Sequence, residues 1–208
     1  MPLPPPDIPR QPLHTRSIRV QSYGREDGLW DLEAELIDYK GYDFTKHLGQ
    51  VVKAGEFIHH MHLRITIDEA YTIVAAQAVY DAAPYGTHCT AIESAYADLV
   101  GMNLLKGFRN QVKARFGNVA GCTHMTELSQ VLPTAAVQTM AGRRRQRAAE
   151  GERPFQLDGC HALRTDGPVV REHYPTWYTG RPAQAPSGDP DAADDAQATD
   201  LPSFSHTS

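Results

Sequence analysis

The first half of the chain alternates apolar and polar positions with the period of two that is typical of strands with one face on a core. Such runs cover residues 18–23, 29–39, 56–67 and 72–80. Short turn sequences, among them Glu26-Asp27-Gly28, separate neighbouring runs. Short connections of this kind join antiparallel strands, so the pattern predicts an antiparallel meander.

The second half changes to the 3.6-residue period of helices. Apolar positions predict one helix that ends at Gly101, a second over 108–116 and a third that begins near Cys122. Pro133 lies inside the third pattern and should kink it or end its first part. Residues 157–174 are ambiguous, and we interpret them first as a hairpin. Strands followed by helices predict an α+β fold, in which two or three helices pack on one face of an antiparallel sheet.

Composition separates the ends of the chain from its middle. Residues 1–14 are rich in proline and should form an extended arm. Residues 179–208 are acidic and poor in large apolar side chains, which predicts a disordered tail. A single domain is therefore expected over residues 15–178.

The net charge of −5 argues against a nucleic-acid partner, which would require a basic face. The chain has one basic run, residues 143–147. We interpret it as the solvated end of a helix rather than as a patch that binds RNA or an acidic partner. No apolar run approaches the ~20 residues that a membrane span needs, and the N-terminus lacks the apolar core of a secretory signal. We therefore expect a cytoplasmic protein without a membrane partner, and the sequence does not identify a protein partner.

Histidines on the third predicted strand differ in phase. His59 shares the apolar face with Met61, whereas His60 and His62 lie on the opposite face. His59 is thus either a hydrogen-bonded histidine at the edge of the core or a ligand or base that points toward the helices.

Two of the three cysteines stand where helices are predicted to begin. Cys89 follows His88 at the start of the first helix, and Cys122 precedes His124 at the start of the third. A helix N-terminus lowers the pKa of a thiol and favours the thiolate that binds metals. His59, Cys89 and Cys122 are therefore the predicted ligands of a zinc or iron ion.

Other residues extend or limit this predicted site. Asp81, at the end of the fourth strand, could be a fourth ligand, a helix-capping acceptor or a turn residue, and the last two roles are commoner. His88 replaces Cys89 if the first helix begins one residue earlier. Cys160 has no placed partner and is interpreted as structural, and three widely spaced cysteines do not form a disulfide framework.

Three sequence runs resemble an uncharacterised bacterial family, domain of unknown function 2889. They are residues 26–31, 81–85 and 121–128, and the resemblance extends over roughly residues 12–178. This likeness implies no activity.

A more distant resemblance links residues 55–140 to iron–sulfur scaffold proteins of the IscU/NifU type. The shared features are the strand at 61–65, the turn at 68–69, and helices that begin at Cys89 and Cys122. The resemblance implies that these two are the middle and last metal-binding cysteines and that His59 replaces an aspartate. Phe57 stands where that family has its first cysteine, which favours a mononuclear site of one histidine and two cysteines over a cluster.

These features support three functional hypotheses. In the first, the protein is a metal-dependent enzyme that acts on a small molecule, with His124 as a proton carrier or fourth ligand. The alternative is an accessory protein that handles metal or iron–sulfur groups. The second alternative is a non-catalytic binding module in which the same residues only pack.

Overall fold

The computed structural model describes residues 3–46 and 49–180. The chain divides into two compact units, Met1–Glu150 and Gly151–Ser208, which are described separately here. The expected tail at 179–208 falls outside the described residues from position 181 onward.

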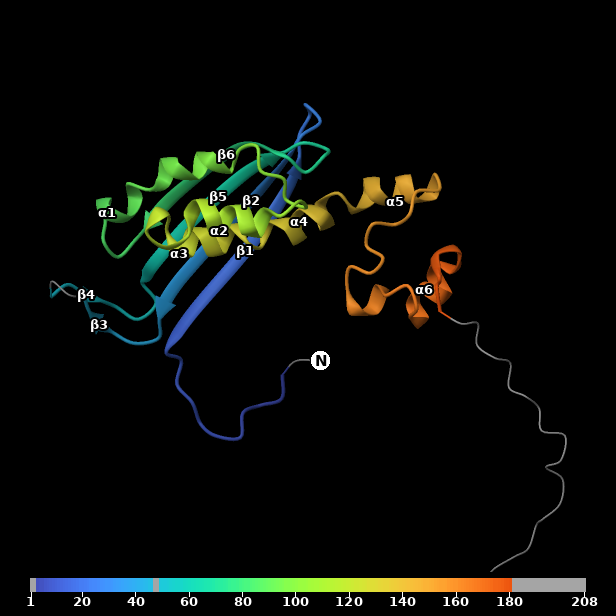
Figure 1. Cartoon of the computed structure of the whole chain (residues 1–208). Helices are drawn as coiled ribbons and strands as arrows, with labels where there is room; N and C mark the ends of the chain where they lie inside the picture. The colour runs from blue at the N-terminus through green and yellow to red at the C-terminus, as the bar shows by residue number, and fades with distance from the viewer. Residues whose placement is uncertain (1–2, 47–48, 181–208) are drawn as a thin grey trace, which may run out of the picture. The chain divides into compact units, whose positions relative to one another are not determined.

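Four long strands build the sheet of the first unit (Figure 1). They are β1 (His14–Gly24), β2 (Trp30–Lys40), β5 (Phe57–Ile67) and β6 (Ile73–Ala82), and they pair in the order β1-β2-β5-β6. All three pairings are antiparallel, which confirms the predicted meander. A two-stranded ribbon, β3 (Phe44–Thr45) and β4 (Val51–Val52), projects from the β2–β5 connection.

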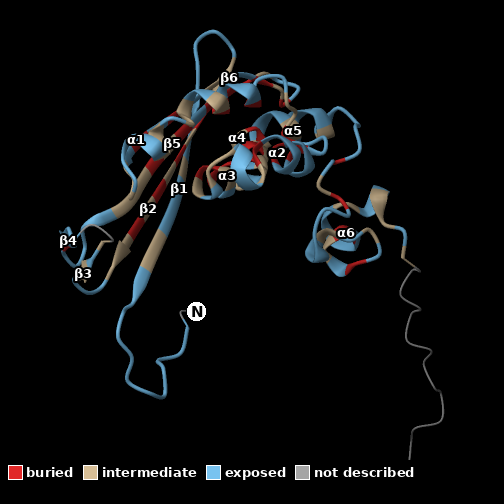
Figure 2. Ribbon diagram, turned by 60° about the vertical axis from the view of Figure 1, so that its left-hand side comes forward, coloured by how far each residue is buried: buried red, intermediate tan, exposed pale blue. Residues whose placement is uncertain are grey.

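Alternation along the strands gives the sheet one apolar and one polar face. Leu32 and Leu36 of β2 lie opposite Ile65 and Met61 of β5, and all four side chains are buried. The alternate residues on the other face, such as Glu33 and Glu35 of β2 and His62 and Arg64 of β5, are partly or fully exposed, and Figure 2 shows buried and less buried positions along the strands. Two β-bulges interrupt the pairing at one end of the sheet: Ile58 is the extra residue between β2 and β5, and Asp81 the extra residue between β5 and β6.

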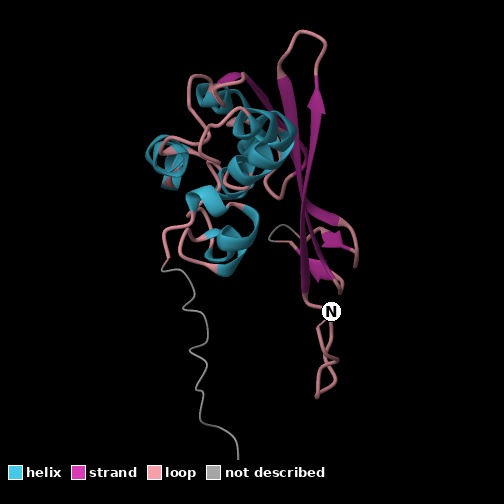
Figure 3. Ribbon diagram, turned by 90° about the vertical axis from the view of Figure 1, so that its right-hand side faces the viewer, coloured by secondary structure: helices cyan, strands magenta, loops and turns pink. Residues whose placement is uncertain are grey.

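Helical segments of the first unit pack on the apolar face. In this unit η1 contacts β6, α3 contacts β2 and β5, and α4 contacts β1 and β2. Figure 3 shows the helical and strand layers side by side. Their buried side chains form one core with the inner side chains of the sheet. The segments are α1 (Thr87–Thr90), η1 (Glu93–Leu99), α2 (Phe108–Phe116), η2 (Asn118–Ala120), α3 (Thr123–Ser129), α4 (Leu132–Thr139) and α5 (Ala141–Ala149).

The predicted third helix is divided as its proline indicated. It begins one residue after Cys122 as α3, and Pro133 stands in the first turn of α4. Proline is tolerated there because the first helical N–H groups have no intrahelical partner. Among the described residues no helix is long and apolar enough to cross a membrane.

The basic run lies on α5, as expected for a helix, but its arginines also contact the sheet. Arg143 lies over the Trp30 ring at 5.0 Å, and Arg147 forms an ion pair of 2.7 Å with Glu69. Arg144 donates to the Tyr71 hydroxyl. The run is thus largely exposed, as expected for a solvated helix end, and some of its arginines also contact β2 and the β5–β6 turn.

In the second unit the predicted hairpin at 157–174 is wrong. The segment forms η3 (His161–Leu163) and α6 (Pro168–His173), and η4 (Pro175–Trp177) follows. Gly167 is the N-cap and Pro168 the first residue of α6, so the Gly-Pro pair starts a helix instead of turning a hairpin. The Asp158 carboxylate accepts the Thr165 N–H at 2.8 Å and closes the preceding loop.

Candidate functional site

A buried carboxylate continues the apolar face of β2. Asp38 follows Leu36 by two residues, so it shares that strand's inner face, and only 3% of its side chain is exposed. It pairs across the sheet with Arg16 of β1 and His59 of β5. Asp38 therefore lies on the core-facing side of the sheet, at the edge of the apolar core.

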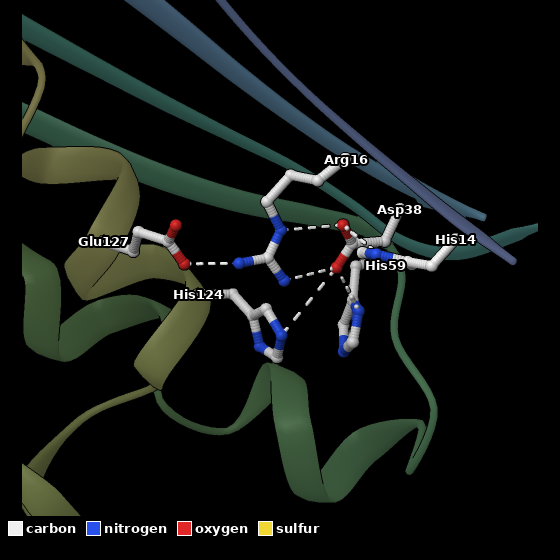
Figure 4. A network of polar contacts seen from close by, with 6 residues as sticks. All are labelled: His14, Arg16, Asp38, His59, His124 and Glu127. Atoms are coloured by element: carbon white, nitrogen blue, oxygen red, sulfur yellow. Dashed lines mark hydrogen bonds and ion pairs between the residues drawn. The ribbon is translucent and has the colours of Figure 1, made fainter. Parts of the chain in front are cut away.

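Four hydrogen-bonding groups surround the Asp38 carboxylate (Figure 4). Arg16 donates from Nε to Oδ1 at 2.8 Å and from Nη2 to Oδ2 at 2.7 Å. His14 Nε2 lies 3.2 Å from Oδ1, and His59 Nδ1 lies 3.0 Å from Oδ2. Burial alone would raise the pKa of Asp38, but the hydrogen bond and charge of Arg16, supported by the interaction with His59, outweigh it, so the pKa lies below its usual value. The carboxylate is therefore ionised at neutral pH.

His59 and His124 bring two imidazoles together from β5 and α3. Their ring centroids are 3.8 Å apart with an interplanar angle of 31°, and His124 Nε2 lies 3.8 Å from Asp38 Oδ2. Burial, followed by the charge of His124, lowers the pKa of His59 despite the opposing effect of Asp38. His59 is thus neutral at pH 7. The ionised Asp38 favours the tautomer with the proton on Nδ1, which leaves the lone pair on Nε2.

Cys122 lies beside this pair as the N-cap of α3. Burial raises the pKa of its thiol, but hydrogen bonds with His124, Tyr80 and two backbone N–H groups prevail and lower the pKa to about 7. Tyr96 fixes the backbone here, because its hydroxyl accepts the Cys122 N–H at 2.9 Å. The Cys122 thiol is therefore more easily deprotonated near neutral pH than an ordinary cysteine.

Tyr80 connects Cys122 with Cys89. Its hydroxyl is buried without a hydrogen bond of normal geometry. Burial, followed by the interaction with Cys122 and the smaller effects of Tyr96 and Cys89, raises its pKa. Cys89 itself lies in the four-residue helix α1 and is partly buried.

The structure thus brings the predicted His59 and His124 together, with Cys122 next to His124 and Cys89 near Tyr80. Within the described ranges, three ligand atoms lie mutually within 4.8 Å in two groups, Asp38–His59–His124 and Glu35–His60–His62. Neither group contains a cysteine, so the predicted His59–Cys89–Cys122 set stays a prediction.

Three further candidates lie elsewhere. Asp81 lies within hydrogen-bond distance of His62 on the polar face of the sheet, away from His59. Its suggested role as a fourth ligand beside His59 is therefore wrong. His88 is exposed. Cys160 is exposed and belongs to the second unit.

Sequence reasoning missed Asp38 and Arg16. A signal for Asp38 was present, since a carboxylate in phase with Leu32, Ala34 and Leu36 must be buried and therefore paired. Arg16 also contacts Glu127 of α3, so the same guanidinium joins β1, β2 and the helix that carries His124.

The thiol provides a direct test of this arrangement. In metal-free protein, we expect the rate of Cys122 alkylation by iodoacetamide to rise with a midpoint near pH 7, because the thiolate is the reacting form. His124→Ala should move the midpoint to higher pH, whereas His173→Ala in the second unit should leave it unchanged. Mass spectrometry of the Cys122 peptide measures the rate. Identical pH profiles for His124→Ala and the wild type would contradict the His124–Cys122 interaction.

Comparison with known proteins gives one match. A family model described as protein of unknown function (DUF2889) matches residues 14–138, which is more than half of the chain. The matched region extends from β1 into α4 and includes Asp38, His59, Cys122 and His124. No curated protein and no solved structure matches the chain significantly. The expected likeness to iron–sulfur scaffolds therefore stays a prediction.

Proposed function

We propose that this chain, which belongs to the family described as protein of unknown function (DUF2889), is a metal-dependent enzyme acting on a small molecule. Its zinc or iron ion is bound by His59, His124 and the Cys122 thiolate. The observation that carries this proposal is the pair of facing imidazoles from β5 and α3, 3.8 Å between centroids, one of them oriented by a buried carboxylate.

Asp38 acts in this proposal on His59 rather than on the metal. Its two oxygens already interact with Arg16, His14 and His59, so a fifth interaction would displace one of these. A histidine that donates Nδ1–H to a carboxylate presents Nε2 to a metal in a fixed orientation. Asp38 therefore serves as the orienting carboxylate of His59.

The charges around the group favour a divalent cation. Arg16 contributes one positive charge, while Asp38, Glu127 and the Cys122 thiolate contribute one negative charge each, which leaves a net charge of −2. A divalent ion neutralises this charge where Asp38 and His59 are poorly hydrated, with 3% and 13% of their side chains exposed. The lowered pKa values of His59 and Cys122 support the same conclusion, because metals bind the deprotonated forms.

Three protein ligands leave a coordination position for water or substrate, which is typical of catalytic rather than structural zinc sites. The ion would polarise a carbonyl or activate a water molecule at that position. The side chain of His124 is 27% exposed and Cys122 is partly exposed, so this end of the group is accessible to solvent. Cys89 is a further candidate for the fourth position.

Cobalt binding tests the ligand set. A thiolate ligand gives Co²⁺ a near-ultraviolet charge-transfer band, which we expect in the wild type and in Cys160→Ala but not in Cys122→Ala. His59→Ala and His124→Ala should weaken Co²⁺ affinity by more than about 100-fold, and Asp38→Asn by about 10- to 100-fold as for an orienting residue. Cys89→Ala tests the fourth position. Saturation of the wild type without the band, together with unchanged affinity in His124→Ala, would refute the proposed centre.

The enzymatic part of the proposal needs a separate measurement. We expect the zinc-loaded protein to hydrolyse an activated ester at a rate that falls to background after chelation and in Cys122→Ala. A bound ion without any metal-dependent turnover would oppose an enzyme and support the metal-handling alternative.

A further inference from the structure

The polar face of the sheet carries a second group of histidines and carboxylates. His60 Nε2 lies 2.9 Å from Glu35 Oε1, and His62 Nε2 lies 2.9 Å from Asp81 Oδ2. The two imidazole rings are neighbours, with centroids 4.5 Å apart. We call Glu35, His60, His62 and Asp81 the outer group.

Strand pairing and a bulge bring these side chains together from three strands. Glu35 of β2 and His60 and His62 of β5 are on the same face, and His62 stands directly opposite Glu35. Asp81 is the bulged residue of β6. A bulge re-aims a side chain, and here the Asp81 carboxylate reaches both imidazoles.

The contacts of His60 leave one ring nitrogen available to a cation. Its Nε2 lies within hydrogen-bond distance of Glu35 Oε1, at 2.9 Å, whereas its Nδ1 lies 3.8 Å from Asp81 Oδ2, beyond that distance. A neutral imidazole has one N–H, so the other nitrogen keeps a lone pair. Imidazole lone pairs and carboxylate oxygens are all ligands for a metal cation.

Two arginines, Arg19 and Arg64, lie near the outer group. Arg64, on the same face of β5, is paired with Glu33 at 2.7 Å. An open hollow of about 430 Å³ borders the group and is lined by Glu35, His62 and Asp81, together with Arg64, Gln77 and Arg19, which stands opposite Glu35 on β1. Solvent and ions therefore reach the group without movement of the backbone.

We propose that the outer group is a second metal site, which binds one zinc-like divalent transition ion through His60, His62 and the carboxylates of Glu35 and Asp81. Ligand atoms of Glu35, His60 and His62 already lie within 4.8 Å of one another. Two imidazoles with carboxylates suit Zn²⁺, Co²⁺ or Ni²⁺, whereas Mg²⁺ and Ca²⁺ prefer oxygen ligands alone. The set contains no thiolate, which distinguishes it from the centre proposed around His59.

The two sites are independent because they lie on opposite faces of β5. His59 contacts His124 and Asp38 on the helix side, while His60 contacts Glu35 on the polar face and His62 lines the hollow. Loss of one site should therefore leave the other intact, and failure of either proposal can be recognised separately.

Calorimetric titration of the chelator-treated full chain with Zn²⁺ tests the outer site. We expect two bound ions per chain in the wild type. His60→Ala and His62→Ala should each weaken one of these events at least about tenfold, since loss of a ligand exceeds the effect of an outer-shell change. Gln77→Ala, which alters the same hollow without removing a ligand, should retain both events. Co²⁺ bound in Cys122→Ala should lack the thiolate band but still depend on His62.

The outer residues are partly exposed, so these variants should fold, and unchanged circular dichroism checks this. Unaltered zinc stoichiometry and affinity in the double variant His60→Ala/His62→Ala would overturn the outer site. The outer site would also be overturned if the wild type bound a single ion and Cys122→Ala bound none. That result would still agree with the centre proposed around His59.

Discussion

Replacing Asp38 with alanine should lower the free energy of unfolding by about 3 kcal/mol, as expected when one partner of a buried ion pair is removed. The substitution deprives Arg16, His14 and His59 of their common acceptor. Arg16 keeps 28% of its side chain exposed and keeps its contact with Glu127, which places the loss near the lower end for such pairs. Urea unfolding of metal-free protein measures the change.

Glu33→Ala is the matched control on the same strand. Glu33 pairs with Arg64 at 2.7 Å, but both side chains are substantially exposed, so the loss should stay below about 0.5 kcal/mol. The pKa of Asp38 is lowered in the folded protein, so its contribution is complete above the unfolded-state pKa and disappears as pH falls through the folded-state pKa. The difference between wild type and Asp38→Ala should shrink in acid. Equal losses for the two variants at neutral pH would show that Asp38 does not organise this end of the sheet.

Replacing Phe116 with alanine should cost about 4 kcal/mol, because it removes a fully buried ring and leaves a cavity. Phe116 ends α2 and stacks on Tyr96 with centroids 4.6 Å apart and ring planes within 12°. Tyr96 in turn accepts the Cys122 N–H. The substitution therefore removes packing directly beneath the start of α3.

Val119→Ala provides the comparison within the same region. Val119 is fully exposed in η2, three residues after Phe116, and its truncation should change the free energy of unfolding by less than about 0.5 kcal/mol. Thermal and urea unfolding of both variants measure the contrast. A Phe116→Ala protein as stable as Val119→Ala would show that the α2–η1 contact is not part of the core.

The sheet could be predicted because local alternation and tertiary burial agree along β2 and β5. Leu32, Leu36, Met61 and Ile65 occupy one phase of their strands and all reach the core. The hairpin predicted for residues 157–174 is wrong because its turn sequence is locally ambiguous. Gly167 and Pro168 are compatible with both a hairpin turn and a helix start, and the packing of Val170 inside the second unit favours the helix.

The candidate site was predictable only in part, because residue type identifies possible ligands but not their neighbours. The phase of His59 and the helix-start position of Cys122 were readable from the sequence. The Arg16–Asp38 pair was not, since it depends on the register between β1 and β2, which brings together two residues 22 positions apart. Cys89 belongs to the predicted ligand set because it stands at a predicted helix start. However, α1 has only four residues, and the direction of so short a helix depends on tertiary packing.

Side chains at neighbouring positions of β5 lie on opposite faces of the sheet. This restricts where insertions and deletions can occur in related sequences. Without a compensating bulge, a one-residue insertion or deletion between 57 and 62 would exchange the two sets of imidazoles and expose Met61. Substitution at one of these positions alters one face only, whereas an insertion or deletion alters both faces together. In an alignment of homologous sequences, a gap inside β5 would therefore mark a change of chemistry on both sides of the sheet, even if every histidine were retained.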